Sequence, residues 1–404
     1  MKIRNLYNIL FIMLPIGLLS AYLYKPLPEH SGAEFKKHVI TTDFISEGVA
    51  VGDVNKNGHT DIIAGAYWFE APDWKAHEIY PGKTYDPAKE YSDSFSNFSL
   101  DVNLDGWIDL IVIGFPGEPA VWYENPKNQK GHWQKHSIND SVGVGNESPN
   151  FVDVDGDGRK DILCANTKAK QIVWLRAPTS RSSLQWQCFT ISEKNAPGTG
   201  RFSHGIGLGD INNDGRKDVI VKEGWWESPE DPTQPNWTFH QADLGEDCSH
   251  IHVLDENSNG LNDVISSSAH RYGVWWHEQQ KDEKEISWKK HVIHDQLSQT
   301  HALALEDING NGYPDLVTGK RFFAHNDTDV DPGAHEPSSL LWFEFMPGKK
   351  PYWKTHEIDN DSGAGLNFVV EDMNNNSMLD IVISNKKGVY YFENRMPNKN
   401  TKSN

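Results

Sequence analysis

Cysteine is scarce in this chain, with three residues among 404. Three cysteines cannot all pair, so we expect no disulfide framework to hold the fold together. Cys164 lies in an apolar run and Cys188 takes the place of a recurring histidine, so we interpret both as core residues. Cys248 stands near several histidines, where a buried thiol is a simpler interpretation than a soft metal ligand.

Clusters of basic residues are also lacking: 38 lysines and arginines stand against 57 acidic residues, for a net charge of −19. Nucleic-acid binding is therefore not expected. The sequence shows no glycine-rich phosphate loop, dinucleotide fingerprint or serine nucleophile elbow. Spacing alone identifies no carboxylate pair for glycoside hydrolysis.

The chain is rich in one aspartate loop, which occurs seven times. Each copy has oxygen-bearing side chains at positions 1, 3 and 5 and an aspartate at position 9. Six copies carry glycine at position 6, where a tight cation-wrapping loop favours it, and Ser377 stands there in the last copy. Alternating carboxylate and amide oxygens suit a hard cation, so we predict structural calcium sites. The predicted ligands are Asp53, Asn55, Asn57, Asp61, Asp101, Asn103, Asp105, Asp109, Asp153, Asp155, Asp157, Asp161, Asp210, Asn212, Asp214, Asp218, Asp255, Asn257, Asn259, Asp263, Asp307, Asn309, Asn311, Asp315, Asp372, Asn374, Asn376 and Asp380.

The loops explain the acidity of the chain, because they contain 18 of its aspartates. Seven divalent ions would bring the net charge to about −5. We therefore do not interpret the acidity as mimicry of nucleic acid.

Successive loops begin 45 to 65 residues apart, which is the length of a four-stranded propeller blade. An apolar run follows each loop, then in most copies an aromatic pair closed by glutamate, as at 68–70, and an aromatic-x-x-His-x-Ile strand, as at 74–79. We predict an all-β fold, a seven-bladed β-propeller. The histidine that recurs in the last strand is interpreted as structural: His38, His77, His136, His240, His291 and His356.

The two ends of the repeat array predict how the ring closes. The strand at 35–40 precedes the first loop, and the last repeat lacks its fourth strand, so the N-terminal strand should complete the last blade. Residues 34–396 then form one domain, and 397–404 a disordered tail. With these motifs the chain resembles the FG-GAP repeat family of calcium-loop propellers, which includes the integrin α-subunit head. The resemblance covers nearly the whole chain.

The N-terminal residues 1–30 look like an export signal: Lys2 and Arg4 precede an apolar stretch from Leu6 to about Leu23. Cleavage of the signal and its retention as a membrane anchor both remain open. No cysteine lies in this segment, which argues against a lipoprotein anchor. We expect a periplasmic, cell-surface or secreted protein.

Departures from the repeat define a candidate site. Six residues before each loop lie the positions expected at the channel mouth: Glu47, Phe95, Glu147, His204, Ser249, His301 and Leu366, with His250 and Asn367 one step further. Blades four to six each place a histidine there, outside the structural register. We interpret these histidines as one site on the face opposite the loops, against the alternative of scattered solvent-facing side chains.

The ends of the second strands point to the same mouth. Blade five supplies His270 and Tyr272, and blade six supplies Lys320, Arg321 and His325. An insertion at 326–339 is expected to build a pocket wall. Converging cations and imidazoles predict an anion or oxyanion site. The alternative is that Lys320 and Arg321 only pair with loop carboxylates.

Residues 301–325 are similar to a blade of the aldos-2-ulose dehydratases, lyases that eliminate water from keto-sugars. Those enzymes continue into cupin domains that isomerise the product, a step not expected here. The similarity implies a reaction class, an elimination next to a carbonyl or carboxylate.

Such an elimination needs a base, a cation for the developing enolate, and an acid. We assign the base to one of His204, His250 and His301. Enolate stabilisation is assigned to Lys320 and Arg321, and the acid to Tyr272 or His325. Alternatively, the three histidines, with Glu47 or Glu147, bind a divalent transition metal.

The predicted function is an exported carbohydrate lyase or dehydratase that acts on a keto-sugar or a uronic-acid-containing saccharide. The alternative is a non-catalytic, calcium-stabilised propeller that binds a glycan or a protein.

Overall fold

The computed structural model describes residues 35–247, 249–282, 285–322, 324–325 and 331–397, which contain strands β1 to β30 and no helix. The predicted all-β class is confirmed. Accordingly, no stretch of these residues forms a helix long and apolar enough to cross a membrane. The expected export signal, Cys248, most of the tail, and part of the blade-six insertion lie outside the described residues.

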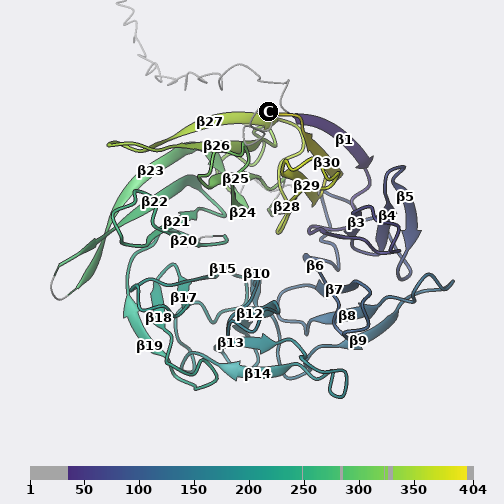
Figure 1. Cartoon of the computed structure of the whole chain (residues 1–404), viewed down its shortest axis with the longest axis horizontal. Helices are drawn as coiled ribbons and strands as arrows, with labels where there is room; N and C mark the ends of the chain where they lie inside the picture. The colour runs from purple at the N-terminus through teal and green to yellow at the C-terminus, as the bar shows by residue number, and fades with distance from the viewer. Residues whose placement is uncertain (1–34, 248, 283–284, 323, 326–330, 398–404) are drawn as a thin grey trace, which may run out of the picture.

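The strands form seven four-stranded antiparallel sheets around a common centre (Figure 1). Blade one contains β2 (Ala50–Gly52), β3 (Asp61–Ala64), β4 (Tyr67–Glu70) and β5 (Lys75–Glu78). Blade two contains β6 (Ser96–Leu100), β7 (Asp109–Ile113), β8 (Val121–Glu124) and β9 (Gln134–Ser137). Blade three contains β11 (Asn150–Val152), β12 (Asp161–Asn166), β13 (Gln171–Arg176) and β14 (Gln187–Thr190). Blade four contains β16 (Gly207–Gly209), β17 (Asp218–Val221), β18 (Gly224–Glu227) and β19 (Thr238–Gln241).

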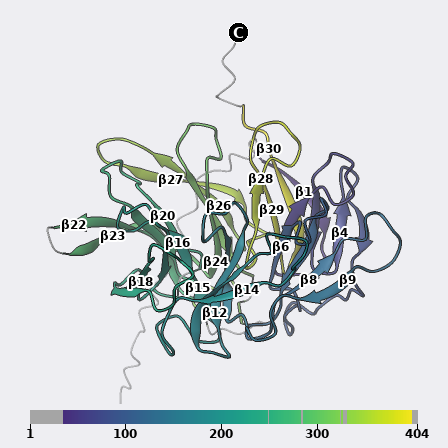
Figure 2. The same ribbon diagram turned by 60° about the horizontal axis from the view of Figure 1, so that its bottom comes forward.

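The remaining blades carry the longest strands. Blade five contains β20 (His252–Leu254), β21 (Asp263–Ser267), β22 (Tyr272–Lys281) and β23 (Ile286–Ser298). Blade six contains β24 (Thr300–Glu306), β25 (Asp315–Lys320), β26 (Leu340–Met346) and β27 (Tyr352–Asp359). Blade seven contains β28 (Val369–Glu371), β29 (Asp380–Asn385), β30 (Gly388–Asn394) and β1 (Phe35–Thr41). The hairpin of β22 and β23 projects beyond the ring (Figures 1 and 2).

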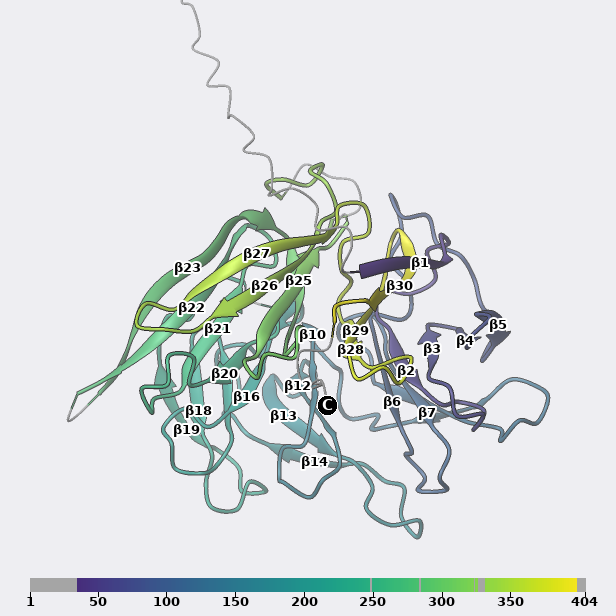
Figure 3. The same cartoon turned by 45° about the horizontal axis from the view of Figure 1, so that its top comes forward.

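The ring closes as predicted. β1 pairs antiparallel with β30, from Phe35 opposite Asn394 to Thr41 opposite Val389. The two ends of the chain thus meet in one sheet, with β1 beside β30 in Figure 3. This pairing covers the edge that a linear array of blades would leave open.

Each recurring histidine stacks on an aromatic ring of the neighbouring strand and binds a glutamate. In blade one, His77 lies 4.2 Å from the Trp68 ring and its Nε2 lies 2.8 Å from Glu70. The same arrangement occurs at His38, His136, His240, His291 and His356. These contacts fit the structural role expected of them.

Blade three departs from this unit and corrects one prediction. Phe189, not Cys188, lies opposite Trp174 and stacks on it at 4.7 Å. Cys188 is exposed, so its interpretation as a core residue was wrong, while Cys164 is buried as predicted. Arg176 replaces the glutamate and binds Asp155 and Asp157 of the aspartate loop.

Candidate functional site

The aspartate at position 9 of each loop is fully buried and holds two backbone segments together. In blade one, Asp61 accepts hydrogen bonds from the N–H groups of Val54 and Ala71, at 3.0 and 2.9 Å. Burial raises its pKa to about 6. Equivalent aspartates of the other blades accept the equivalent N–H group, which lies near or just after the end of the third strand. Position 9 is therefore an architectural residue, which the loop pattern alone does not reveal.

Backbone hydrogen bonds shape the rest of each loop. Asp53 accepts the N–H groups of Asn57 and Gly58, each at 3.0 Å, which folds the loop around its side-chain oxygens. Gly58 has φ +87°, and all six position-6 glycines lie between +84° and +90°, as predicted for a tight turn. In blade three, the carboxylates of Asp153, Asp155 and Asp161 approach within 4.8 Å of one another. An all-oxygen donor set at positions 1, 3, 5 and 9 fits calcium.

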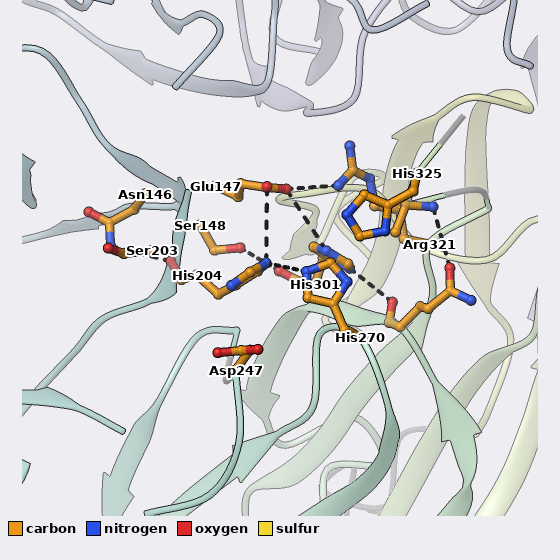
Figure 4. Close-up of polar contacts among 12 residues, drawn as sticks. Asn146, Glu147, Ser148, Ser203, His204, Asp247, His270, His301, Arg321 and His325 are labelled. Carbon is orange, nitrogen blue, oxygen red and sulfur yellow. Dashed lines mark hydrogen bonds and ion pairs between the residues drawn. The ribbon is translucent and has the colours of Figure 1, made fainter. Parts of the chain in front are cut away.

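A cluster of three histidines lies at the opposite end of the inner strands (Figure 4). His204 belongs to β15 (Ser203–Gly205), His301 to β24, and His270 to the turn between β21 and β22. The Nε2 atoms of His204 and His270 lie 2.7 Å apart. One nitrogen from each of the three rings lies within 4.8 Å of the others. The structure thus brings together His204 and His301, predicted as candidate bases, with His270, which was predicted at the same mouth without a role.

The outer hydrogen bonds of two rings fix where their lone pairs point. His301 Nδ1 lies 3.1 Å from the carbonyl oxygen of Gln299 and must donate to it, because a carbonyl only accepts. Its Nε2 is then an unprotonated acceptor; it is buried and has no hydrogen-bond partner among the described residues. His270 Nδ1 faces Asp331 at 3.2 Å, which leaves the Nε2 of the neutral ring as a second lone pair.

Burial keeps two rings of the cluster neutral. It lowers the pKa of His204 to about 4. His301 is 0% exposed, and burial, followed by the nearby Arg321 charge, holds its pKa well below its usual range. Neutral imidazoles with lone pairs aimed at one point are the form in which histidine binds metals.

A buried arginine holds two carboxylates from distant blades. Arg321 is 2% exposed and follows β25; its Nη1 lies 2.9 Å from Glu147 and its Nη2 lies 2.8 Å from Glu47. Burial raises the pKa of Glu47 and the Arg321 charge partly offsets that rise. Burial alone would lower the pKa of Arg321, but the two carboxylates outweigh it and raise that pKa.

Glu147 lies beside the histidines because of a short parallel pair of strands. β10 (Asn146–Ser148) runs parallel to β15, with Asn146 opposite Ser203 and Ser148 opposite Gly205. The carboxylate of Glu147 consequently lies 4.0 Å from Nε2 of His204 and 3.9 Å from Nε2 of His301.

The blade-six insertion contributes Asp331, which contacts two histidines at once. Its carboxylate lies 3.2 Å from His270 and 2.7 Å from Nδ1 of His325, whose ring stacks on His270 at 4.6 Å. Burial would raise the pKa of Asp331, but the two histidines outweigh it and lower that pKa. The bond to Asp331 raises the pKa of His325.

Three predicted site residues lie elsewhere. The Nδ1 atom of His250 accepts the Leu303 N–H at 3.4 Å, and His250 lines a separate cavity of about 390 Å³ rather than the cluster of His204 and His301. Lys320 is buried and donates to the carbonyls of Gly333, Ala334 and Glu336, and burial lowers its pKa to about 8.

The third of these residues, Tyr272, donates to a carboxylate oxygen of Glu336 at 2.7 Å. Burial, followed by that carboxylate, raises its pKa to about 12. Lys320 and Tyr272 therefore anchor the insertion. Arg321 does pair with carboxylates, those of Glu47, in the connection between β1 and β2, and of Glu147, and not with carboxylates of the insertion.

A cavity of about 430 Å³ opens beside His204 and His270. Four charged residues also line this cavity: Arg201, Lys222, Glu223 and Asp247. The cluster therefore has a space next to it large enough for a small ligand.

Comparisons with known proteins agree with the repeat and the fold. A profile described as an FG-GAP-like repeat matches residues 101–164 and 153–221. A search of curated protein sequences finds no match. Among solved structures, a chain from the crystal structure of BBS1N in complex with ARL6DN superimposes with a TM-score of 0.52 at 9% identity, over 91% of this chain and 97% of that chain. At this identity the likeness shows the fold alone.

Two further structures are similar at a lower level. An Agrocybe aegerita lectin that recognises non-reducing terminal N-acetylglucosamine gives a TM-score of 0.45 at 15% identity, over 80% of this chain and 82% of that chain. The exotype rhamnogalacturonan lyase YesX gives 0.45 at 10% identity, over 90% and 73% of the two chains. We draw no functional argument from these two.

Proposed function

Starting from a seven-bladed β-propeller that carries FG-GAP-like repeats, we propose that the channel mouth holds a divalent transition metal and acts as a metal-dependent carbohydrate lyase. The metal ligands are His204, His270 and His301, with Glu147 beside them. The observation that carries the proposal is the buried Nε2 of His301, which has no hydrogen-bond partner among the described residues and faces two other imidazoles. Three nitrogen ligands leave coordination positions open for water or substrate.

The residues around the cluster have the contacts that metal-binding histidines need. Asp331 and the Gln299 carbonyl orient His270 and His301 through their Nδ1 atoms, as the hydrogen-bond partners of ligand histidines do in metal sites. Gln299 has φ +57°, a conformation that side-chained residues rarely adopt. The same carbonyl accepts the N–H of Arg321, so one strained residue positions both side chains.

The metal, when bound, would polarise a carbonyl or carboxylate oxygen of the substrate and so favour loss of the adjacent proton. Glu147 is held by Arg321 next to two ligand imidazoles, where its carboxylate can accept that proton. His325 lies at the rim, 41% exposed on its side chain, and can donate a proton to the leaving group. The similarity of residues 301–325 to aldos-2-ulose dehydratases favours elimination over other reactions of such a site.

The test combines metal analysis with an activity assay. The purified wild-type protein and H301A are analysed for bound zinc, manganese, iron, cobalt and nickel. Both are then incubated with keto-sugars and uronate oligosaccharides, and ultraviolet absorbance reports a new conjugated double bond. We expect about one transition metal per wild-type chain, none in H301A, and double-bond formation only by the wild type. A wild-type protein that takes up no transition metal would refute the metal centre.

A non-catalytic binding function is the second candidate. It is favoured by the positions of Lys320 and Tyr272, which anchor the insertion and so are not available as enolate stabiliser and acid. Saturable saccharide binding without any product, in a metal-loaded protein, would select this candidate.

We also propose that the aspartate loops bind calcium as structural sites and that the protein is exported. The first proposal is supported by the oxygen-only loops and the second by the N-terminal sequence pattern.

A further inference from the structure

The rim of the 430 Å³ cavity beside His204 carries an exposed aromatic ring. Phe202 is 41% exposed and lies two residues before His204. Its backbone has φ +64°, which is uncommon for a side-chained residue. The Phe202 N–H donates to the carbonyl of Gly145 at 2.9 Å, which holds this conformation. An exposed ring kept in an unfavourable backbone conformation beside a cavity suggests a role for the ring itself.

Phe202 ends a row of rings that crosses the mouth from blade two. Phe95 packs on Phe115 at 5.4 Å, and Phe115 packs edge-on against Phe202 at 5.6 Å. Phe95 is buried whereas Phe202 is not. Phe115 therefore supports one side of the Phe202 ring, and Phe202 lines the cavity.

The neighbouring Arg201 has a charge that no protein carboxylate neutralises in the described ranges. Its guanidinium lies over Phe202 at 4.9 Å and over Phe115 at 5.2 Å, and its Nε donates to the carbonyl of Pro116 at 2.6 Å. These contacts fix the planar group at the cavity wall. They leave the two terminal nitrogens without any carboxylate among the described residues.

The other charges of the cavity wall are already paired. Lys222 lies 2.8 Å from Asp247 and 3.9 Å from Glu223. The wall thus has a positive side at Arg201 and a side at Lys222 where one ammonium group lies near two carboxylates. A planar guanidinium that presents two donors matches a carboxylate better than it matches a hydroxyl group.

We propose that this cavity is a subsite for a hexuronate residue, with Phe202 stacked on the sugar ring and Arg201 bound to the carboxylate. The inference rests on the proposed function, since it places the reacting sugar next to the histidine cluster. Of the two substrate classes considered, keto-sugars and uronates, the subsite selects uronates. A neutral keto-sugar would offer the Arg201 guanidinium no carboxylate.

Calorimetry on the full chain tests the subsite. The probes are tetrasaccharides of galacturonate, mannuronate and guluronate, each compared with its carboxyl-reduced neutral counterpart. We expect at least one uronate to bind about tenfold or more tightly than its neutral counterpart. R201Q should remove that preference, and R201K should retain only part of the preference that the wild type shows. F202A should weaken both forms by several fold, and F202Y should not.

Arg181→Gln is the matched control, because Arg181 is an exposed arginine whose Nε also donates to a backbone carbonyl, that of Leu104. It should leave binding unchanged. Equal binding of all uronates and their neutral counterparts, an absence of binding, or wild-type selectivity in R201Q would overturn the subsite.

Metal content, measured on the same samples, separates this inference from the proposed function. A chain without metal that still prefers uronates through Arg201 would refute the metal-dependent lyase and keep the subsite. A metal-loaded chain without that preference would refute the subsite alone.

Discussion

The Nε2 atom of His204 lies 2.7 Å from the Nε2 atom of His270, and neither ring comes from the blade of His301, the third member of the cluster. Two imidazole nitrogens at this distance share one proton when no cation lies between them, and they would move apart to about 3.3 Å to bind one tetrahedral metal. The bond from Asp331 to the far side of His270, together with the unpartnered Nε2 of His301, favours the cation.

His301 and His291 should respond to alanine substitution in opposite ways. H301A should lose the transition metal and reduce activity by about 100-fold or more, with a small effect on melting temperature. H291A removes a ring that stacks on Trp276 and binds Glu278, so it should cost about 1–3 kcal/mol of stability and leave the metal in place. Metal analysis and thermal melting of both variants decide between these outcomes. Equal metal content in the two variants would contradict the assignment.

Arg321→Ala should destabilise the protein by about 3–5 kcal/mol, because it leaves Glu47 and Glu147 buried without their cation. Denaturant unfolding measures this loss. Glu47→Gln in the R321A background should recover part of it, since an amide costs less to bury than an unpaired carboxylate. An R321A protein as stable as the wild type would show that the pairing of Arg321 with Glu47 and Glu147 does not stabilise the fold.

Calcium removal should lower the melting temperature of the whole domain. Each loop organises the turn of one blade, and binding to the native state adds stability at every site by mass action. Calorimetric scans with and without a calcium-selective chelator provide the measurement. A melting temperature that the chelator leaves unchanged would contradict a structural role for calcium in the aspartate loops.

Protonation of His277 should contribute a loss of stability as the pH falls from about 6.5 towards 4, opposite in sign to the contribution of the buried position-9 aspartates, whose pKa values are raised. Burial lowers the pKa of His277 to about 4, and its ring contacts Ser266 at 3.0 Å. Because the folded-state pKa is depressed, the unfolded chain binds a proton first as the pH falls below 6.5, and the stability present at higher pH is lost. The loss is at most roughly 3 kcal/mol for this one residue. Denaturant unfolding gives the free energy of unfolding of H277N and of the wild type between pH 7 and pH 4. H277N should lack the part of the pH dependence that His277 contributes, and an unchanged pH dependence would contradict the assignment.

Removal of residues 35–41 should prevent folding, because β1 completes blade seven by pairing with β30. Removal of residues 1–30 should not. Circular dichroism and size-exclusion chromatography of the two truncations distinguish these results. A folded monomer without residues 35–41 would show that closure does not need this strand.

The repeat made the fold predictable. Loop spacing, aromatic pairs and the missing last strand define seven blades and their closure, because each blade restates the same local pattern. The error at Cys188 arose where the pattern breaks: Phe189 takes the place of the histidine and Arg176 that of the glutamate.

The strand register predicted which residues lie at the channel mouth. Counting along the inner strands identified His204 and His301, and the ends of the second strands placed His270 at the same mouth. The contact of His270 with His204 was not predicted, because a turn between β21 and β22 sets the direction of that side chain. The pairing of Arg321 with Glu47 and Glu147 joins residues 274 and 174 positions apart, and no local pattern signals such a contact.

Anomalous diffraction from crystals grown with zinc is the most direct test of the metal centre. We expect one anomalous peak about 2.0–2.1 Å from Nε2 of each of His204, His270 and His301, with Glu147 beside it. Zinc-loaded crystals without a peak between these three rings, and with the Nε2 atoms of His204 and His270 hydrogen-bonded to each other, would contradict it.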